Sequence, residues 1–221
     1  MAAVVVPLTL VPASAGAASV ATNPVHNTAD DASAGYVSVL ADQTEVQGSF
    51  IIPKVTCTGT QYFAMSLQLE GKNGATDESM VSAAEAYCSA SGKKPTWSTY
   101  ACAGANCVET AKVAPGNTVT ATDSFTASET TATLLDVTTG AHEKAVGAGA
   151  TSATNSNFID QRAQATVPTF KTVAWSHCTI NGESLGSTGP FKENMTNADN
   201  KVQVAVGAVH GSGFTTIFKH S

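Results

Sequence analysis

Residues 157–163 read Asn-Phe-Ile-Asp-Gln-Arg-Ala and place a carboxylate next to an amide. A carboxylate such as that of Asp160 can act as a general base. An amide such as that of Gln161 can hold a water molecule or stabilise a developing oxyanion. If the segment is a strand, Asp160 and Gln161 point to opposite faces. The stretch is therefore either the working edge of an active site or a strand that carries some polar residues.

Five cysteines are the next candidates for chemistry: Cys57, Cys88, Cys102, Cys107 and Cys178. No histidine stands at a spacing that suggests a zinc site, and no glycine-rich phosphate loop occurs, so we expect no metal and no cofactor. Cys57 and Cys88 each end a strand-like run and could pair, while the pair 102 and 107 could close a tight loop. We predict these two disulfides and a buried free thiol at position 178.

The composition bounds the class of protein. The 221 residues include 11 Lys plus Arg against 17 Asp plus Glu, a net charge of -6. Phosphate binding requires a basic surface, so nucleic acid is excluded as a partner. No later stretch reaches the about 18 apolar residues of a membrane span. We expect a monomer.

The N-terminal segment predicts secretion. An apolar run over residues 2–10 is followed by small-x-small patterns around Ala15, as in a signal peptide. We therefore expect a signal-peptide-like segment over residues 1–18, a flexible leader over 19–34 and one domain over 35–221, in an extracellular protein.

Short runs rich in Val, Thr and Phe dominate the rest of the chain. They alternate with period two and are bounded by Gly, Asn, Pro or Asp, which is typical of strands. Residues 78–88 fit helix or strand by composition, and their flanks favour strand. The expected strands are 35–40, 45–55, 60–69, 78–88, 117–125, 131–137, 170–180, 201–210 and 213–220. Together they predict an all-β fold, a two-sheet antiparallel β-sandwich.

Several segments, in order along the chain, share a pattern with one family. They are Gly35-Tyr36, Val46-x-Gly48-Ser49-Phe50-x-x-Pro53 followed by Cys57, the Glu-Ala-x-Cys that ends at Cys88, Val113-x-Pro115-Gly116-Asn117 and Ile180-Asn181-Gly182-x-Ser184-Leu185-Gly186. The chain resembles the eqolisins, or glutamic peptidases. That resemblance implies a jelly-roll, concanavalin-like sandwich with a substrate groove on its concave sheet.

The resemblance also implies a catalytic pair. In eqolisins a Glu activates the attacking water and a Gln on a neighbouring strand stabilises the oxyanion. The Gln position, seven residues before the Cys of Glu-Ala-x-Cys, falls on Val81. The last position of the pattern Glu-Trp-Ile-x-Glu falls on Gln161. Val81 has no hydrogen-bond donor and Gln161 has no carboxylate, so the dyad is not retained at these matched positions.

Other groove residues follow from the same alternation. If Val81 faces the groove, so does Glu85, about 13 Å further along the strand, too far to act at the same carbonyl. Asp160 should point to the other face. Trp97 could line the groove, although packing in the sheet is the commoner role of such an aromatic.

We therefore expect an inactive peptidase-like protein that binds a peptide or glycan in the groove, or that serves an extracellular structural role. The alternative is an acid endopeptidase with a rearranged site. A lectin-like binder is a third possibility, resting on the fold alone.

Overall fold

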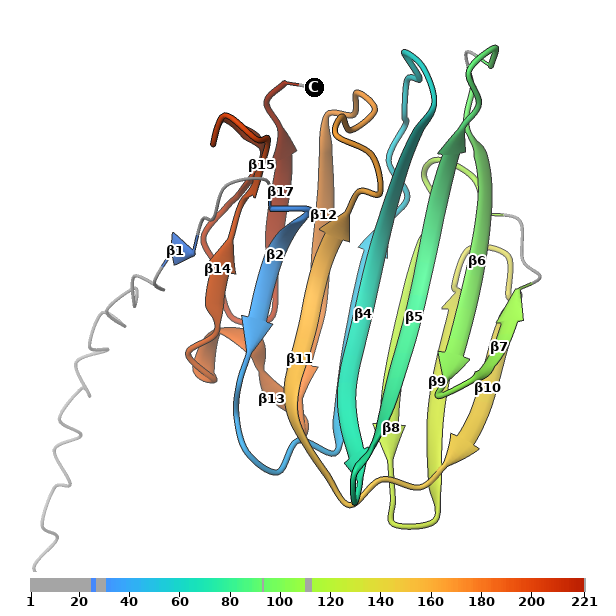
Figure 1. The fold of residues 1–221 in the computed structure, drawn as a ribbon, viewed down its shortest axis with the longest axis vertical. Helices are drawn as coiled ribbons and strands as arrows, with labels where there is room; N and C mark the ends of the chain where they lie inside the picture. Colours follow the sequence, from blue (N-terminus) through green and yellow to red (C-terminus); the bar gives the residue numbers. More distant parts are fainter. Residues whose placement is uncertain (1–24, 27–30, 93, 110–112, 221) are drawn as a thin grey trace, which may run out of the picture.

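The computed structural model describes residues 25–26, 31–92, 94–109 and 113–220, and strands account for most of its regular structure. In that described part the one helical element is a three-residue 3-10 turn, η1 (Leu185–Ser187). This turn falls far short of the length that a membrane-spanning helix requires. Two sheets stack face to face (Figure 1), as the period-two runs predicted.

The first sheet, sheet A, carries the segment 157–161. Its strands in spatial order are β1 (Val25–His26), β14 (Phe191–Glu193), β2 (Ser33–Ser38), β11 (Ser152–Gln161), β4 (Gln61–Asn73), β5 (Thr76–Cys88), β6 (Thr96–Ala103) and β7 (Asn106–Glu109). All neighbours pair antiparallel except β1 and β14, which are parallel. The long strands β11, β4 and β5 lie side by side at its centre (Figure 1).

The second sheet, sheet B, lies behind it in the same view. Its strands in spatial order are β10 (His142–Ala148), β9 (Glu129–Asp136), β8 (Thr118–Phe125), β3 (Glu45–Ile51), β12 (Thr172–Ile180), β17 (Phe214–Phe218), β16 (Val202–Val206) and β15 (Met195–Thr196). The short strand β13 (Glu183–Ser184) also pairs with β12.

One hydrophobic core fills the space between the sheets. The ring of Trp175 in sheet B is stacked on that of Phe214, with ring centroids 5.6 Å apart. Its centroid lies 4.9 Å from that of Phe50 and 6.5 Å from that of Phe158. These rings are buried. The remaining core is built from aliphatic and alanine side chains at alternate strand positions, as expected where two sheets pack about 10 Å apart.

Both predicted disulfides are present. Cys57 is bonded to Cys88 and Cys102 to Cys107, while Cys178 is a buried free thiol. Burial raises the pKa of that thiol, so it stays protonated.

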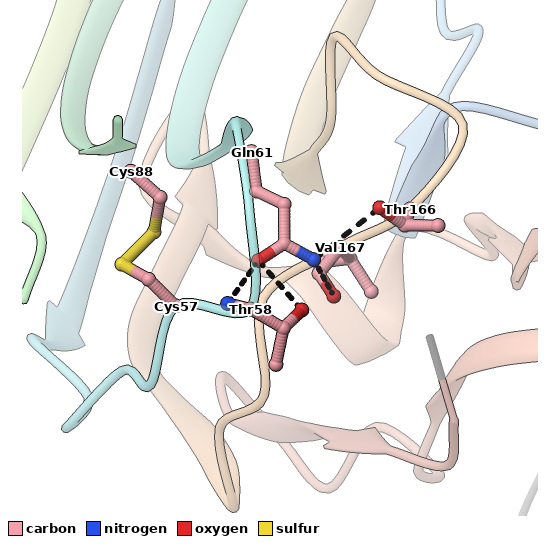
Figure 2. Close-up of a disulfide and its surroundings, with 6 residues drawn as sticks. All are labelled: Cys57, Thr58, Gln61, Cys88, Thr166 and Val167. Atoms are coloured by element: carbon pink, nitrogen blue, oxygen red, sulfur yellow. Dashed lines mark hydrogen bonds between the residues drawn. A yellow bond between two sulfur atoms is a disulfide. The ribbon is translucent and has the colours of Figure 1, made fainter. Parts of the chain in front are cut away.

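A buried glutamine fastens the end of sheet A beside the first disulfide (Figure 2). Gln61 accepts hydrogen bonds at Oε1 from the backbone N–H and the hydroxyl of Thr58, at 3.0 and 3.2 Å. Its Nε2 donates to Thr166 Oγ1 at 3.3 Å and to the carbonyl of Val167 at 3.2 Å. These bonds hold the loop that follows β11 against the start of β4, so they fix the end of the strand that carries Gln161.

The structure adds strands that the sequence did not predict. Residues 78–88 are strand, as their flanks favoured, but β6, β7, β10 and the short strands β13, β14 and β15 fall outside the expected set. Part of the expected leader is also strand, since β1 lies at residues 25–26 and β2 begins at Ser33. The signal-peptide-like segment 1–18 lies outside the described residues.

Candidate functional site

The outer face of sheet A carries the candidate site. Along β11 the alternation directs Phe158 and Asp160 into the core and Asn157, Ile159 and Gln161 outward. The segment 157–161 therefore separates its polar groups, with the carboxylate on the inner face and the amides on the outer face. The segment is a strand, and its outward side chains are the amides of Asn157 and Gln161 with Ile159 between them.

The outward amides of β11 join those of β4 in one chain of hydrogen bonds. Gln68 is its centre: it donates from Nε2 to Gln161 Oε1 at 3.2 Å and accepts at Oε1 from Asn157 Nδ2 at 3.0 Å. Asn157 Nδ2 also lies 3.4 Å from Glu70 Oε1, and Asn155 Nδ2 donates to Glu70 Oε2 at 3.0 Å. We call Asn155, Asn157, Gln161, Gln68 and Glu70 the amide row.

Small side chains form the floor under the amide row. Ala64 and Ser66 of β4 and Ala83 of β5 have no exposed surface, although they point to the outer face. The Ser66 hydroxyl accepts a 3.0 Å hydrogen bond from Gln68 Nε2. The Gln68 amide therefore lies over Ser66 and helps to cover it.

Besides the buried Oδ1 of Asn155, two polar groups of the amide row have no hydrogen-bond partner among the described residues. Gln161 uses its Oε1, and its Nε2 remains free to donate. Asn157 uses its Nδ2, and its Oδ1 remains free to accept. A peptide group offers one carbonyl and one N–H, so both open positions have a natural complement in an extended main chain.

The two positions matched to the catalytic dyad do not meet. Gln161 lies opposite Ala64, which lies opposite Glu85. Val81 instead lies opposite Gln68, which lies opposite Asn157. Along the strands these levels are four residues, or about 13 Å, apart. The register thus puts Asn157, the first position of the Glu-Trp-Ile-x-Glu pattern, at the level of Val81, a relation that sequence matching missed.

Glu85 lies on the outer face, as predicted, and is hydrogen-bonded to hydroxyl groups outside the amide row. Its carboxylate accepts hydrogen bonds from Tyr62 Oη at 2.8 Å and from Ser98 Oγ at 3.0 Å. It shares its level with Gln161, two strands away, which corresponds to about 10 Å across the sheet.

Two other candidates lie inside the sandwich. Trp97 belongs to the core and is 9% exposed, so its inclusion in the groove was wrong; the outward positions of β6 are Thr96, Ser98, Tyr100 and Cys102. Asp160 is fully buried and accepts hydrogen bonds from Trp175 Nε1 at 3.3 Å and from the hydroxyl of Thr216. Burial raises the pKa of Asp160 to about 7, although both hydrogen bonds lower it. Asp160 cannot reach a ligand on the outer face.

The described residues offer no cluster of three or more His, Cys, Asp or Glu side chains that could hold a metal ion. The outer face of sheet A carries amides, hydroxyls and carboxylates, and among the carboxylates Glu70 and Glu85 lie beside the amide row or at its level.

Comparison with known proteins shows the fold. No protein-family model matches the sequence, and no curated protein matches it. Scytalido-glutamic peptidase, solved with a transition-state analogue inhibitor, superposes with a TM-score of 0.71 over 87% of this chain and 100% of its own, at 15% identity. SCP-B, an eqolisin solved with the tripeptide Ala-Ile-His, gives 0.68 over 87% and 100% at 14% identity. Aspergilloglutamic peptidase from Aspergillus niger gives 0.54 over 72% and 99%, also at 14%. The chain has an eqolisin-like fold, a two-sheet β-sandwich.

Proposed function

We propose that this glutamic-peptidase-like protein binds an extended peptide on the outer face of sheet A and does not hydrolyse it. One observation carries the proposal: positions 157 and 161 of β11 present amides on the outer face and leave Gln161 Nε2 and Asn157 Oδ1 open. Two solved relatives of the fold hold peptide-like ligands, a peptide-based transition-state analogue in one and a tripeptide in the other.

The absence of hydrolysis follows from the side chains of β11. Both glutamate positions of the Glu-Trp-Ile-x-Glu pattern are amides here, Asn157 and Gln161. An amide cannot take a proton from water near neutral or acid pH. The proposal therefore holds whichever of the two positions matches the base, and a lost base alone costs about 10²- to 10⁴-fold in rate.

A peptide suits this surface better than a glycan does. The open groups are one donor and one acceptor, and each peptide group of a main chain offers the matching carbonyl and N–H. Sugar hydroxyls could use the same groups, so an oligosaccharide is the competing outcome of the test.

Binding is tested by NMR titration of the ¹⁵N-labelled protein with an alanine-rich pentapeptide and, separately, with a neutral oligosaccharide. We expect the peptide to shift the side-chain amide signals of Gln68, Asn157 and Gln161. Gln68→Leu should weaken binding at least about tenfold, because it breaks the hydrogen-bonded row. The matched control is Gln47→Leu, at a partly exposed position on sheet B. Shifts caused by the oligosaccharide alone would refute the peptide proposal.

The second candidate function is an acid endopeptidase with a rearranged site. One observation favours it: Glu70 places a carboxylate within hydrogen-bond reach of Asn157 and Asn155. Casein digestion between about pH 2 and pH 5, around the carboxylate pKa values, separates the candidates. Cleavage by the wild type that is lost in Glu70→Ala or Glu85→Ala would establish the enzyme.

We also propose that the protein is secreted. The two disulfides support this, because such bonds persist in oxidising compartments. Cleavage of the N-terminal segment in a secreting host, detected by mass spectrometry of the medium, tests it.

A further inference from the structure

Tyrosines gather around Glu85 on the outer face of sheet A. The chain has four tyrosines, and three of them lie on the neighbouring strands β4, β5 and β6 at outward positions: Tyr62, Tyr87 and Tyr100. Tyr62 and Tyr87 are directly opposite one another, and Tyr87 is 49% exposed. The fourth, Tyr36, lies in the core.

The carboxylate of Glu85 has hydroxyl partners but no cationic one. Tyr62 and Ser98 donate to its two oxygens, one each. No lysine, arginine or histidine of the described residues pairs with it. A carboxylate has about four acceptor positions, so each oxygen keeps capacity for a further donor. A half-buried negative charge without a counter-ion attracts a cation.

The tyrosines hold this carboxylate in position. Burial first, and then the neighbouring Tyr100 and Glu85, raise the pKa of Tyr62 above its usual range. Its phenol therefore stays protonated and keeps donating to Glu85. Burial also raises the pKa of Tyr100, which contacts the Tyr62 hydroxyl. The site is thus a fixed anion between uncharged aromatic rings.

We propose that Glu85, framed by Tyr62, Tyr87 and Tyr100, is a subsite for a lysine or arginine side chain of the bound peptide; this rests on the proposed function. Ammonium and guanidinium groups pair with carboxylates and also favour the faces of aromatic rings. Glu85 and Gln161 share one level of the sheet with only Ala64 between them. A main chain held by the amide row can therefore extend one long basic side chain over Ala64 to Glu85.

The test uses two pentapeptides, Ac-Ala-Ala-Arg-Ala-Ala-NH₂ and the same peptide with citrulline, a neutral isostere, in place of arginine. We expect wild type to bind the arginine peptide about tenfold more tightly, the contribution of one charged hydrogen-bonded pair. Glu85→Gln should abolish that preference and leave citrulline binding unchanged. The matched control, Glu183→Gln, removes an exposed carboxylate of sheet B and should retain it.

A second variant guards against misfolding of Glu85→Gln. Tyr87 is exposed, so Tyr87→Leu should fold normally and should weaken binding of the arginine peptide alone. Equal binding of both peptides to wild type would overturn the subsite and leave peptide binding intact. If neither peptide binds, the proposed function fails, and the subsite is then probed with Nα-acetyl-arginine amide. Absence of shifts around Glu85 with that probe would overturn the subsite independently.

Discussion

Asp160→Asn should remove the part of the pH dependence of folding stability that comes from this buried carboxyl group. Asp160 is fully buried between the sheets, and burial raises its pKa to about 7 from 3.8. Between these two values the folded protein keeps a proton that the unfolded chain releases. The contribution of Asp160 to the free energy of unfolding is therefore fully present below about pH 4 and is lost as pH rises to about 7.

The size of the effect follows from the two pKa values. A difference of about 3 pH units corresponds to about 4 kcal/mol of unfolding free energy. Asparagine cannot ionise, and its amide can still accept from Trp175 Nε1 and donate to the Thr216 hydroxyl. The variant should thus match wild type within about 1 kcal/mol at pH 3 and exceed its stability by up to about 4 kcal/mol at pH 8.

Urea unfolding followed by tryptophan fluorescence, at pH 3, 5, 6, 7 and 8, measures this difference. Subtracting wild type from variant at each pH cancels groups common to both. Asp199→Asn, at an exposed site with no part in the core, is the matched control and should give a flat difference. A flat difference for Asp160→Asn would show that this carboxyl does not hold its proton in the folded state.

Three further changes test other parts of the structure. Asp136→Asn should destabilise the protein more at pH 7 than at pH 3 in urea unfolding. Burial raises the pKa of Asp136, but hydrogen bonds from Thr139, Asn117 and backbone N–H groups outweigh burial and lower it, so the stability that this carboxylate contributes is lost as pH falls. A larger loss at pH 3 would contradict this. Gln61→Ala should cost about 1–3 kcal/mol by thermal unfolding, because it leaves the buried carbonyl of Val167 unpaired (Figure 2); an unchanged Tm would refute it. Replacing Cys57 and Cys88 together by alanine removes a bridge of sequence separation 31 and should cost about 4 kcal/mol by chain entropy; a loss under about 1 kcal/mol would rule out that role.

The sequence by itself determined the fold class and the faces of the strands. Period-two runs fix which side chains share a face, because successive residues of a strand point to opposite sides. That rule put Asp160 and Gln161 on opposite faces and Glu85 on the same face as Val81, as the structure shows. Cysteines at the ends of two strand-like runs predicted the first disulfide, and the close spacing of Cys102 and Cys107 predicted the second.

Only the tertiary structure decided which outward residues meet. Register between strands distant in sequence depends on the packing of the whole sandwich, and local alternation does not specify it. Strand β4, residues 61–73, lies between β11 and β5, and its register with both strands decides which residues are opposite one another. It aligns Asn157, Gln68 and Val81 in one row across the sheet. It aligns Gln161, Ala64 and Glu85 in another row. The same long-range pairing placed Thr96–Ala103 beside β5 and turned Trp97 toward the core.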